Sequence, residues 1–167
     1  MSLLDLILSR RSIRSYEKKE IPEDVLKRIL EAGRQAPSAG NRQPIRFIVV
    51  KEPDVLKNLC DKLINRFVKY APVAVVGCAN VKSLLTGRWA IVDTTIAMQN
   101  MVIAAWTFGI GSCWVGACNK ETVKKLLNVP DKWKFVALLT LGYPAEQPKP
   151  RKKKQFEDLF SFNSFQS

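Results

Sequence analysis

Apolar residues recur along the chain at two spacings, and each spacing predicts a different element. Residues 3–8 place leucine and isoleucine side chains on one side of a short helix. Ser2 precedes them as a suitable N-cap, and Asp5 is an acidic residue where a helix start favours one. We expect a second helix to have Pro22 in its first turn, where the missing N–H costs nothing, and to stop before Pro37.

The rest of the compact part alternates between strand and helix patterns. Runs of β-branched and aromatic residues predict strands at 46–50, 73–79, 112–116 and 135–141. Helical spacing predicts helices at 53–69, 88–108 and 120–127, the last capped by Asn119. The helix at 88–108 is apolar around most of its circumference, so we expect it at the centre of the fold or of a dimer, with Gly109 as its C-cap. Because helices interleave with strands, the sequence predicts an α+β chain folded as a three-layer α/β/α sandwich.

The C-terminal segment differs from the rest of the chain. It is rich in proline after Tyr143, which disfavours both helix and central strand. It then ends with four phenylalanines, at positions 156, 160, 162 and 165, and a solvent-exposed tail does not normally carry so many. We therefore expect a single domain at 1–167, with 143–167 as an extended C-terminal arm that packs on a second copy of the chain.

The composition indicates one globular domain, with 167 residues, 47% hydrophobic and 25% charged. Residues 89–115 are apolar enough to raise the question of a membrane span. Asp93, Gln99 and Asn100 interrupt them, so a buried helix explains the stretch better. Because no signal-peptide pattern is visible either, we expect a cytoplasmic protein with no membrane partner.

The residue types that are missing limit the chemistry. The chain has no histidine, and its four cysteines, Cys60, Cys78, Cys113 and Cys118, form no CxxC pair. The usual zinc sites and the histidine-dependent nucleophiles are therefore excluded, and we read the cysteines as small buried hydrophobes. We assign no metal site and no catalytic side chain, and expect the chemistry to depend on a cofactor.

The net charge of +12 suggests nucleic acid as one alternative partner. Five of the positive charges fall within residues 149–154, whereas the others are scattered among acidic residues. No known DNA- or RNA-reading motif occurs. Nucleic-acid binding therefore stays a minor hypothesis.

Three segments carry candidate chemistry. Arg10, Arg11, Ser12 and Arg14 could clamp a phosphate, since arginine presents a planar fork of donors; the alternative is a solvated helix end. The loop 36–44 could approach a heteroaromatic ring, with small residues and the amides of Asn41 and Gln43, or could be an ordinary loop. The glycines of 109–116 do not form a dinucleotide fingerprint, because they follow a helix and the third one is misplaced.

The order of these segments resembles the nitroreductase-like flavoproteins. That family has an R-R-S-x-R-x-Y/F element, then A-P-S-x-x-N-x-Q-P, then D-x-x-x-A-M-Q-N followed by G-x-G-S-C-W-x-G. These motifs stand here at 10–16, 36–44, 93–100 and 109–116, and a closing G-Y-P-A-E stands at 142–146. The resemblance covers nearly the whole chain and implies a mixed, largely antiparallel sheet.

The resemblance also implies a cofactor and its ligands. FMN would lie at the interface of a homodimer, so that both chains build each site. Arg10, Arg11, Ser12 and Arg14 would hold the phosphate and ribityl chain, joined by a basic residue near the C-terminus, Arg151 or Lys153. The partner would supply Pro37, Ser38 and Asn41, with Gln43 in the same loop, while Trp114, Val115 and Gly116 would pass close to the flavin ring.

The implied function is an NAD(P)H-dependent FMN oxidoreductase with a ping-pong mechanism, in which NADH or NADPH reduces the flavin and leaves before a small organic acceptor such as a nitroaromatic or quinone enters. Only residues 80–87 separate the strand from the following helix, where many family members have a longer excursion, so we expect a more open pocket. The alternative within this resemblance is a non-catalytic flavin-binding or redox-sensing module.

Overall fold

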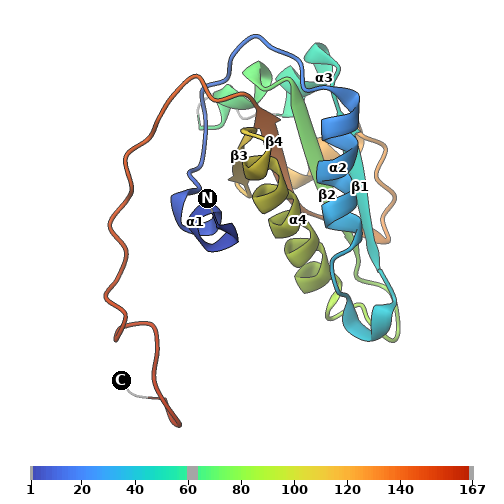
Figure 1. The fold of residues 1–167 in the computed structure, drawn as a ribbon. Coiled ribbons are helices and arrows are strands. Elements are labelled where there is room, and N and C mark those ends of the chain that lie inside the picture. Colours follow the sequence, from blue (N-terminus) through green and yellow to red (C-terminus); the bar gives the residue numbers. More distant parts are fainter. Residues whose placement is uncertain (1, 60–63, 166–167) are drawn as a thin grey trace.

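The computed structural model describes residues 2–59 and 64–165. Its helices and strands follow in the order α1 (Leu3–Ser9), α2 (Glu23–Arg34), β1 (Ile45–Val50), α3 (Pro53–Leu59), β2 (Val73–Asn80), α4 (Ala90–Thr107), β3 (Gly111–Val115), α5 (Lys120–Leu126) and β4 (Trp133–Gly142) (Figure 1). Two short 3-10 helices, η1 (Ala39–Asn41) and η2 (Arg66–Tyr70), lie in the connections.

The four strands form one sheet in the order β1-β2-β4-β3, and every pair of neighbours is antiparallel. The expected mixed character is limited, in the described residues, to one parallel bridge between Ser12 and Ser112 beside the edge strand β3. Strands β2 and β4 are central and almost entirely buried, as their continuous apolar sequences require.

Helices cover both faces of the sheet, which confirms the three-layer sandwich (Figure 1). Residues that alternate along a strand point to opposite faces. On β2, Val73 and Val75 join the core beneath α2 and α4, whereas Ala74 and Val76 join the core beneath α3 and α5. The hydrophobic burial of both faces fixes the register of the central strands.

The inner side of helix α4 packs against both the sheet and α2. Gly33 permits this approach, because a Cβ at that position would lie 2.2 Å from Cε of Met101. The outer side keeps Ile91 and Val92 exposed. The helix ends as predicted, since Gly109 follows it with a φ of +70° and Ile110 N–H donates to the carbonyl of Ala105.

The caps at Ser2 and Asn119 are confirmed, but two details of the predicted helices are wrong. Pro22 is the N-cap of α2 and not a residue of its first turn. The single helix predicted at 53–69 is an α-helix in its described first part, Pro53–Leu59, but 66–70 form the 3-10 helix η2. Asn65 donates its side-chain N–H to the carbonyl of Ala117, which fixes the chain before η2. Apolar spacings of three and four residues do not separate the two helix types.

Two of the cysteines, Cys78 and Cys113, are buried as expected, and Cys118 is half-buried; Cys60 lies outside the described residues. No helix of the described chain combines the length and hydropathy that crossing a bilayer requires. These same residues hold no group of His, Cys, Asp or Glu suited to a metal ion.

The C-terminal segment leaves the body after β4 and runs as an irregular chain along one side (Figure 1). Residues 151–165 are exposed throughout. The rings of Phe156 and Phe160 stack on each other with centroids 4.5 Å apart.

Candidate functional site

The segment 10–14 is held against the start of β3. After α1 ends, Arg10 adopts an extended conformation, and Ile13 N–H donates to the carbonyl of Ser112 at 2.9 Å. The Ile13 side chain is 1% exposed. A Cβ on Gly111 would lie 2.6 Å from Cγ1 of Ile13, so glycine permits this close approach. The result is a fixed backbone, with Ser12 and Arg14 on the other side of the segment from Ile13.

A buried hydrogen-bond network fixes the residues that follow. The hydroxyl of Tyr16 lies 2.5 Å from the carbonyl oxygen of Ile13 and 2.6 Å from Oγ1 of Thr140. Thr140 in turn lies within hydrogen-bond distance of the Cys113 carbonyl. Burial raises the pKa of Tyr16, so the phenol stays protonated and neutral.

The base of the arm pairs with the same segment. Glu17 N–H donates to the carbonyl of Tyr143 at 2.9 Å, and Ala145 N–H donates to that of Ser15 at 3.0 Å. Oε1 of Glu146 accepts hydrogen bonds from the backbone N–H groups of Arg14 and Ser15. The chain that leaves β4 is thereby brought beside Arg10, Arg11 and Arg14, here called the arginine cluster.

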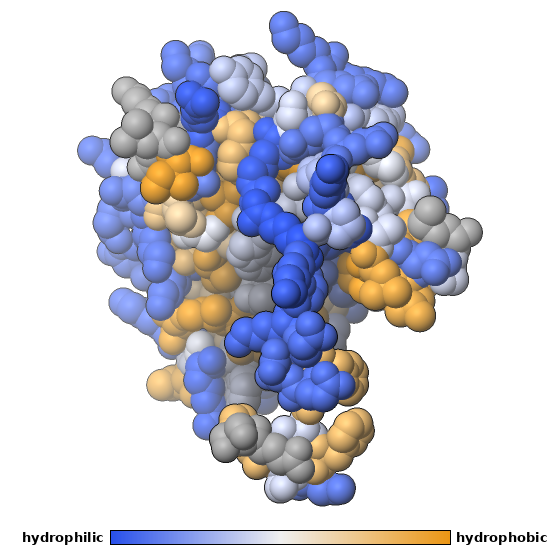
Figure 2. Space-filling view, turned by 90° about the vertical axis from the view of Figure 1, so that its left-hand side faces the viewer, coloured by the Kyte–Doolittle hydropathy of each residue, from blue (hydrophilic) through white to orange (hydrophobic). Residues whose placement is uncertain are grey.

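The arginine cluster and the arm together enclose a cavity of 430 Å³, here called the cationic pocket. Its lining is rich in basic side chains and, among the described residues, includes no acidic one; it consists of Ile7, Leu8, Arg10, Arg11, Ser12, Arg14, Pro148, Lys149, Arg151 and Lys153. The four residues expected to hold a phosphate thus share one pocket with both C-terminal candidates. Figure 2 views this side of the molecule, with the hydrophilic arm lying across it.

Arg11 has a structural role as well. Its Nη1 donates to the carbonyls of Leu8, Ser9 and Arg10 at 2.9–3.0 Å, which caps the C-terminus of α1. Both explanations offered for the cluster therefore apply to this one residue, a helix end and a wall of the cationic pocket.

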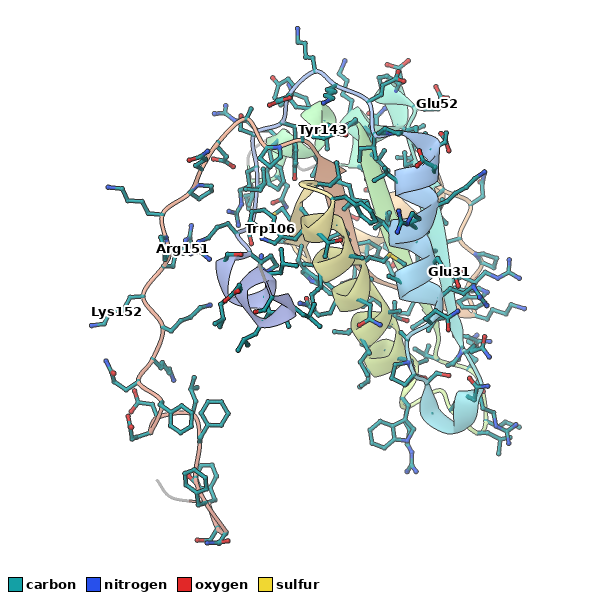
Figure 3. The ribbon with its side chains drawn as sticks, viewed as in Figure 1. Glu31, Glu52, Trp106, Tyr143, Arg151 and Lys152 are labelled. Atoms are coloured by element: carbon teal, nitrogen blue, oxygen red, sulfur yellow. The ribbon has the colours of Figure 1, made fainter. Side chains whose placement is uncertain are left out.

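A larger cavity of 910 Å³ adjoins the pocket between α1, the end of α4 and the base of the arm. Trp106 lines it and donates its indole N–H to Oγ of Ser9 at 3.2 Å. Figure 3 shows Trp106 at this end of α4 and Arg151 on the arm. Arg11 and Pro148 line both cavities.

The side chains at the end of β3 point to different faces of the sheet. Trp114 pairs with Leu139, and residues opposite each other in an antiparallel pair share a face. Leu139 belongs to the core beneath α4, so the Trp114 side chain is on that face, where it is 37% exposed. Val115 points into the opposite core. Gly116 faces open space, since a Cβ there would meet no atom within 4 Å.

The loop 37–43 lies elsewhere. Ala39 N–H donates to Oδ1 of Asp93 in the first turn of α4, whereas the cationic pocket is near the other end of that helix. An 18-residue helix is about 27 Å long. One chain therefore does not bring Pro37, Ser38, Asn41 and Gln43 to the arginine cluster.

The loop itself is well defined. Gly40, Asn41 and Gln43 have positive φ angles, which glycine and asparagine tolerate best. Gln43 N–H donates to Oγ of Ser38, and the Gln43 amide donates to the carbonyl of Asn41. Asn41 and Gln43 are exposed, so this loop lies at the surface.

Sequence reasoning gave no role to three groups that hold the site together: the Tyr16 hydroxyl, the Asp93 carboxylate and the Glu146 carboxylate. Asp93 is the only acidic residue in an apolar helix, which could have marked it. It is buried, and its Oδ2 has no hydrogen-bond partner in the described chain. Thr140, one of the two partners of Tyr16, and both partners of Glu146 lie more than 120 positions away along the chain, so no local pattern reveals these contacts.

Comparisons with known proteins agree on one group. The model of the nitroreductase family matches residues 7–84 and 71–143. A protein of Methanothermobacter thermautotrophicus, whose name proposes NADH dehydrogenase or NAD(P)H nitroreductase activity, is 35% identical over 90% of this chain and 82% of its own. The crystal structure of a nitroreductase family protein from Clostridium novyi is 31% identical with a TM-score of 0.80, covering 90% of this chain and 89% of its own. An FMN-dependent nitroreductase structure from Clostridium difficile is 30% identical with a TM-score of 0.83, covering 97% and 99%.

Proposed function

The chain belongs to the nitroreductase family, and we propose that it is an NAD(P)H-dependent oxidoreductase that binds FMN and passes electrons to a small organic acceptor. The names of its relatives support the nicotinamide donor, and an FMN-dependent structural neighbour supports the cofactor. The acceptor, the mechanism and the individual ligands are part of the proposal.

The observation that carries it is the cationic pocket. A flavin phosphate bears close to two negative charges, and removing it from water is costly unless cations surround it. Arg10 and Arg14 from the N-terminal segment and Arg151 and Lys153 from the arm line one cavity with the Ser12 hydroxyl. Their donor chemistry fits a phosphate, so we assign these residues to the FMN phosphate and ribityl chain.

The ring is assigned to the surface beside Trp114, Val115 and Gly116. Ser112, beside the arginine segment, is four residues from Gly116 along β3, a distance of about 13 Å. An extended ribityl phosphate can bridge it. The open space at Gly116 leaves room for a planar ring, and backbone N–H groups at the end of the strand can donate to it.

A homodimer completes the site in this proposal. Loop 37–43 contacts the first turn of α4, and the cationic pocket lies near the other end of this helix, which is about 27 Å long. We therefore assign Pro37, Ser38, Asn41 and Gln43 to the site of a second copy. The exposed apolar residues of α4, Ile91 and Val92, and those of α1 offer a surface for that copy.

When bound, FMN supplies the two-electron carrier that the side chains of this chain lack. The residues bind and orient the cofactor, while NADH or NADPH and the acceptor, a nitroaromatic or a quinone, use the same open face in turn. No side chain is assigned as acid or base, and histidine is absent.

The test is the visible spectrum of the purified protein, recorded before and after adding NADH or NADPH without oxygen. A flavin spectrum that bleaches supports the oxidoreductase. Bound FMN that neither donor reduces would favour a flavin-binding or redox-sensing module instead. A colourless protein that takes up no added FMN would overturn the proposal, and its affinity for DNA and RNA would then be measured at several salt concentrations.

A further inference from the structure

One acidic side chain joins the two parts of the cationic pocket. Glu146 stands at the base of the arm, and its Oε1 accepts hydrogen bonds from two consecutive backbone N–H groups, those of Arg14 and of Ser15, the latter at 3.0 Å. Consecutive N–H groups that converge on one oxygen form an anion-binding concavity, and bonds to an ionised acceptor are the stronger kind. The carboxylate thus fixes the backbone of Arg14, which with Arg10 is here called the clamp.

Glu146 is also where the arm leaves the body. Residues 143–145 pair with 15–17 through backbone hydrogen bonds, and Glu146 continues this contact through its side chain. From 147 to 155, the described chain makes no hydrogen bond to the body. The course of the following segment therefore depends on the direction in which Glu146 holds its base.

That course decides which cations face the clamp. Lys149, Arg151 and Lys153 line the cationic pocket, whereas Lys152 points away from the body (Figure 3). Alternate residues of an extended chain point in opposite directions, and Pro148 and Pro150 stiffen this stretch. These cations repel Arg10 and Arg14 until an anion lies between them. An attachment at the base of the arm offsets that repulsion.

We propose that Glu146 is a positioning residue for the cofactor phosphate: it fixes the backbone of Arg14 and aims the arm so that Lys149, Arg151 and Lys153 complete the clamp. This inference rests on the proposed binding of FMN. It assigns to Glu146 no contact with the cofactor and no part in the chemistry.

The experiment compares FMN with riboflavin, which lacks the phosphate, on apo-protein variants by flavin fluorescence. Replacing Glu146→Ala removes the acceptor, and we expect FMN affinity to fall about tenfold, as for loss of a charge-assisted hydrogen bond, with riboflavin affinity unchanged. Glu146→Gln keeps an oxygen that can accept the same bonds but loses the charge, so its FMN affinity should lie between those of the unaltered and the Glu146→Ala proteins. Glu157→Ala removes an exposed arm carboxylate outside both cavities and serves as the matched control.

A second readout is independent of the cofactor. Trypsin cleaves after lysine and arginine unless proline follows, so residues 151–154 offer four such positions, and Lys149, which precedes Pro150, offers none. The Glu146→Ala apo-protein should be cut there faster than the unaltered and Glu157→Ala proteins. Equal losses of FMN and riboflavin affinity, or unchanged FMN affinity with an unchanged cleavage rate, would overturn the role of Glu146. An unaltered protein that binds neither flavin would instead refute the proposed function.

Discussion

Arg10 and Arg14 are held by their backbones, and both line the cationic pocket, while the Arg14 guanidinium also lies over the Phe67 ring, 5.9 Å from its centroid. Arg10 donates its backbone N–H to the carbonyl of Leu6, and Arg14 donates its own to Glu146. None of the salt bridges in the described chain involves either residue. Two arginines that line one cavity and have no carboxylate partner leave their donors available for an anion, which is the physical case for a phosphate.

Replacing Arg10 and Arg14 together by alanine should weaken FMN binding by about a hundredfold or more, because two charged donors to the phosphate are lost. Secondary structure by circular dichroism and the molecular mass by light scattering should be unchanged. Lys152→Ala with Lys154→Ala removes the same net charge from arm positions outside the pocket lining and is the control. Unaltered FMN affinity in the arginine variant would refute the assignment of the clamp.

The phenol of Tyr16 acts on stability. Tyr16→Phe removes the hydroxyl that joins Ile13 to Thr140, and we expect the free energy of unfolding to fall by about 1–2 kcal/mol near pH 7, measured with urea. Burial raises the pKa of Tyr16 above its usual value of about 10. The hydroxyl's contribution is therefore complete below pH 10 and declines at higher pH, since the unfolded chain ionises first. A gap between the two proteins that stays constant above pH 10 would contradict this linkage.

At the scale of elements, local chemistry identified most helices and strands correctly. Ser2, Asn119 and Gly109 act at helix ends through bonds to neighbours in sequence, so they are readable without the fold. The predicted helix at 53–69 failed because Asn65 is held by Ala117, a contact from a distant part of the chain. The motif at 10–16 grouped Arg10, Arg11, Ser12 and Arg14, which do line one pocket. The contact of Glu146 with this segment could not be predicted, because its partners are 131 and 132 positions away.

The contact between β3 and the arginine segment offers a test at this scale. Gly111→Ala would place a Cβ 2.6 Å from Cγ1 of Ile13 and 3.0 Å from Cγ of Pro144, neither of which can yield easily. We expect a loss of about 1–3 kcal/mol in the free energy of unfolding from overpacking. FMN affinity should fall as well, since the segment 10–14 is displaced. Gly116→Ala, where nothing is within 4 Å, should leave the stability unchanged. Equal stability of the two variants would show that the contact is not tight.

At the scale of the whole molecule, one chain carries two parts of the proposed site at opposite ends of α4. Two copies related by a twofold axis can pair the clamp of each with the loop of the other, because such an interface repeats every contact twice. The exposed phenylalanines of the arm and the exposed leucines of α1 give the molecule further apolar surface for such a partner.

This arrangement predicts complementation between two defective chains. The Arg10→Ala, Arg14→Ala chain keeps its loop, and a Ser38→Ala, Asn41→Gly chain keeps its clamp, with glycine chosen because position 41 has a φ of +53°. Each should bind FMN poorly alone. After unfolding and refolding together, half of the dimers would be mixed, and each mixed dimer would hold one intact site, so about a quarter of all sites should bind FMN tightly. Fluorescence titration against each refolded parent measures that fraction. A site built within one chain would give no recovery, because neither parent then contains a complete set of residues.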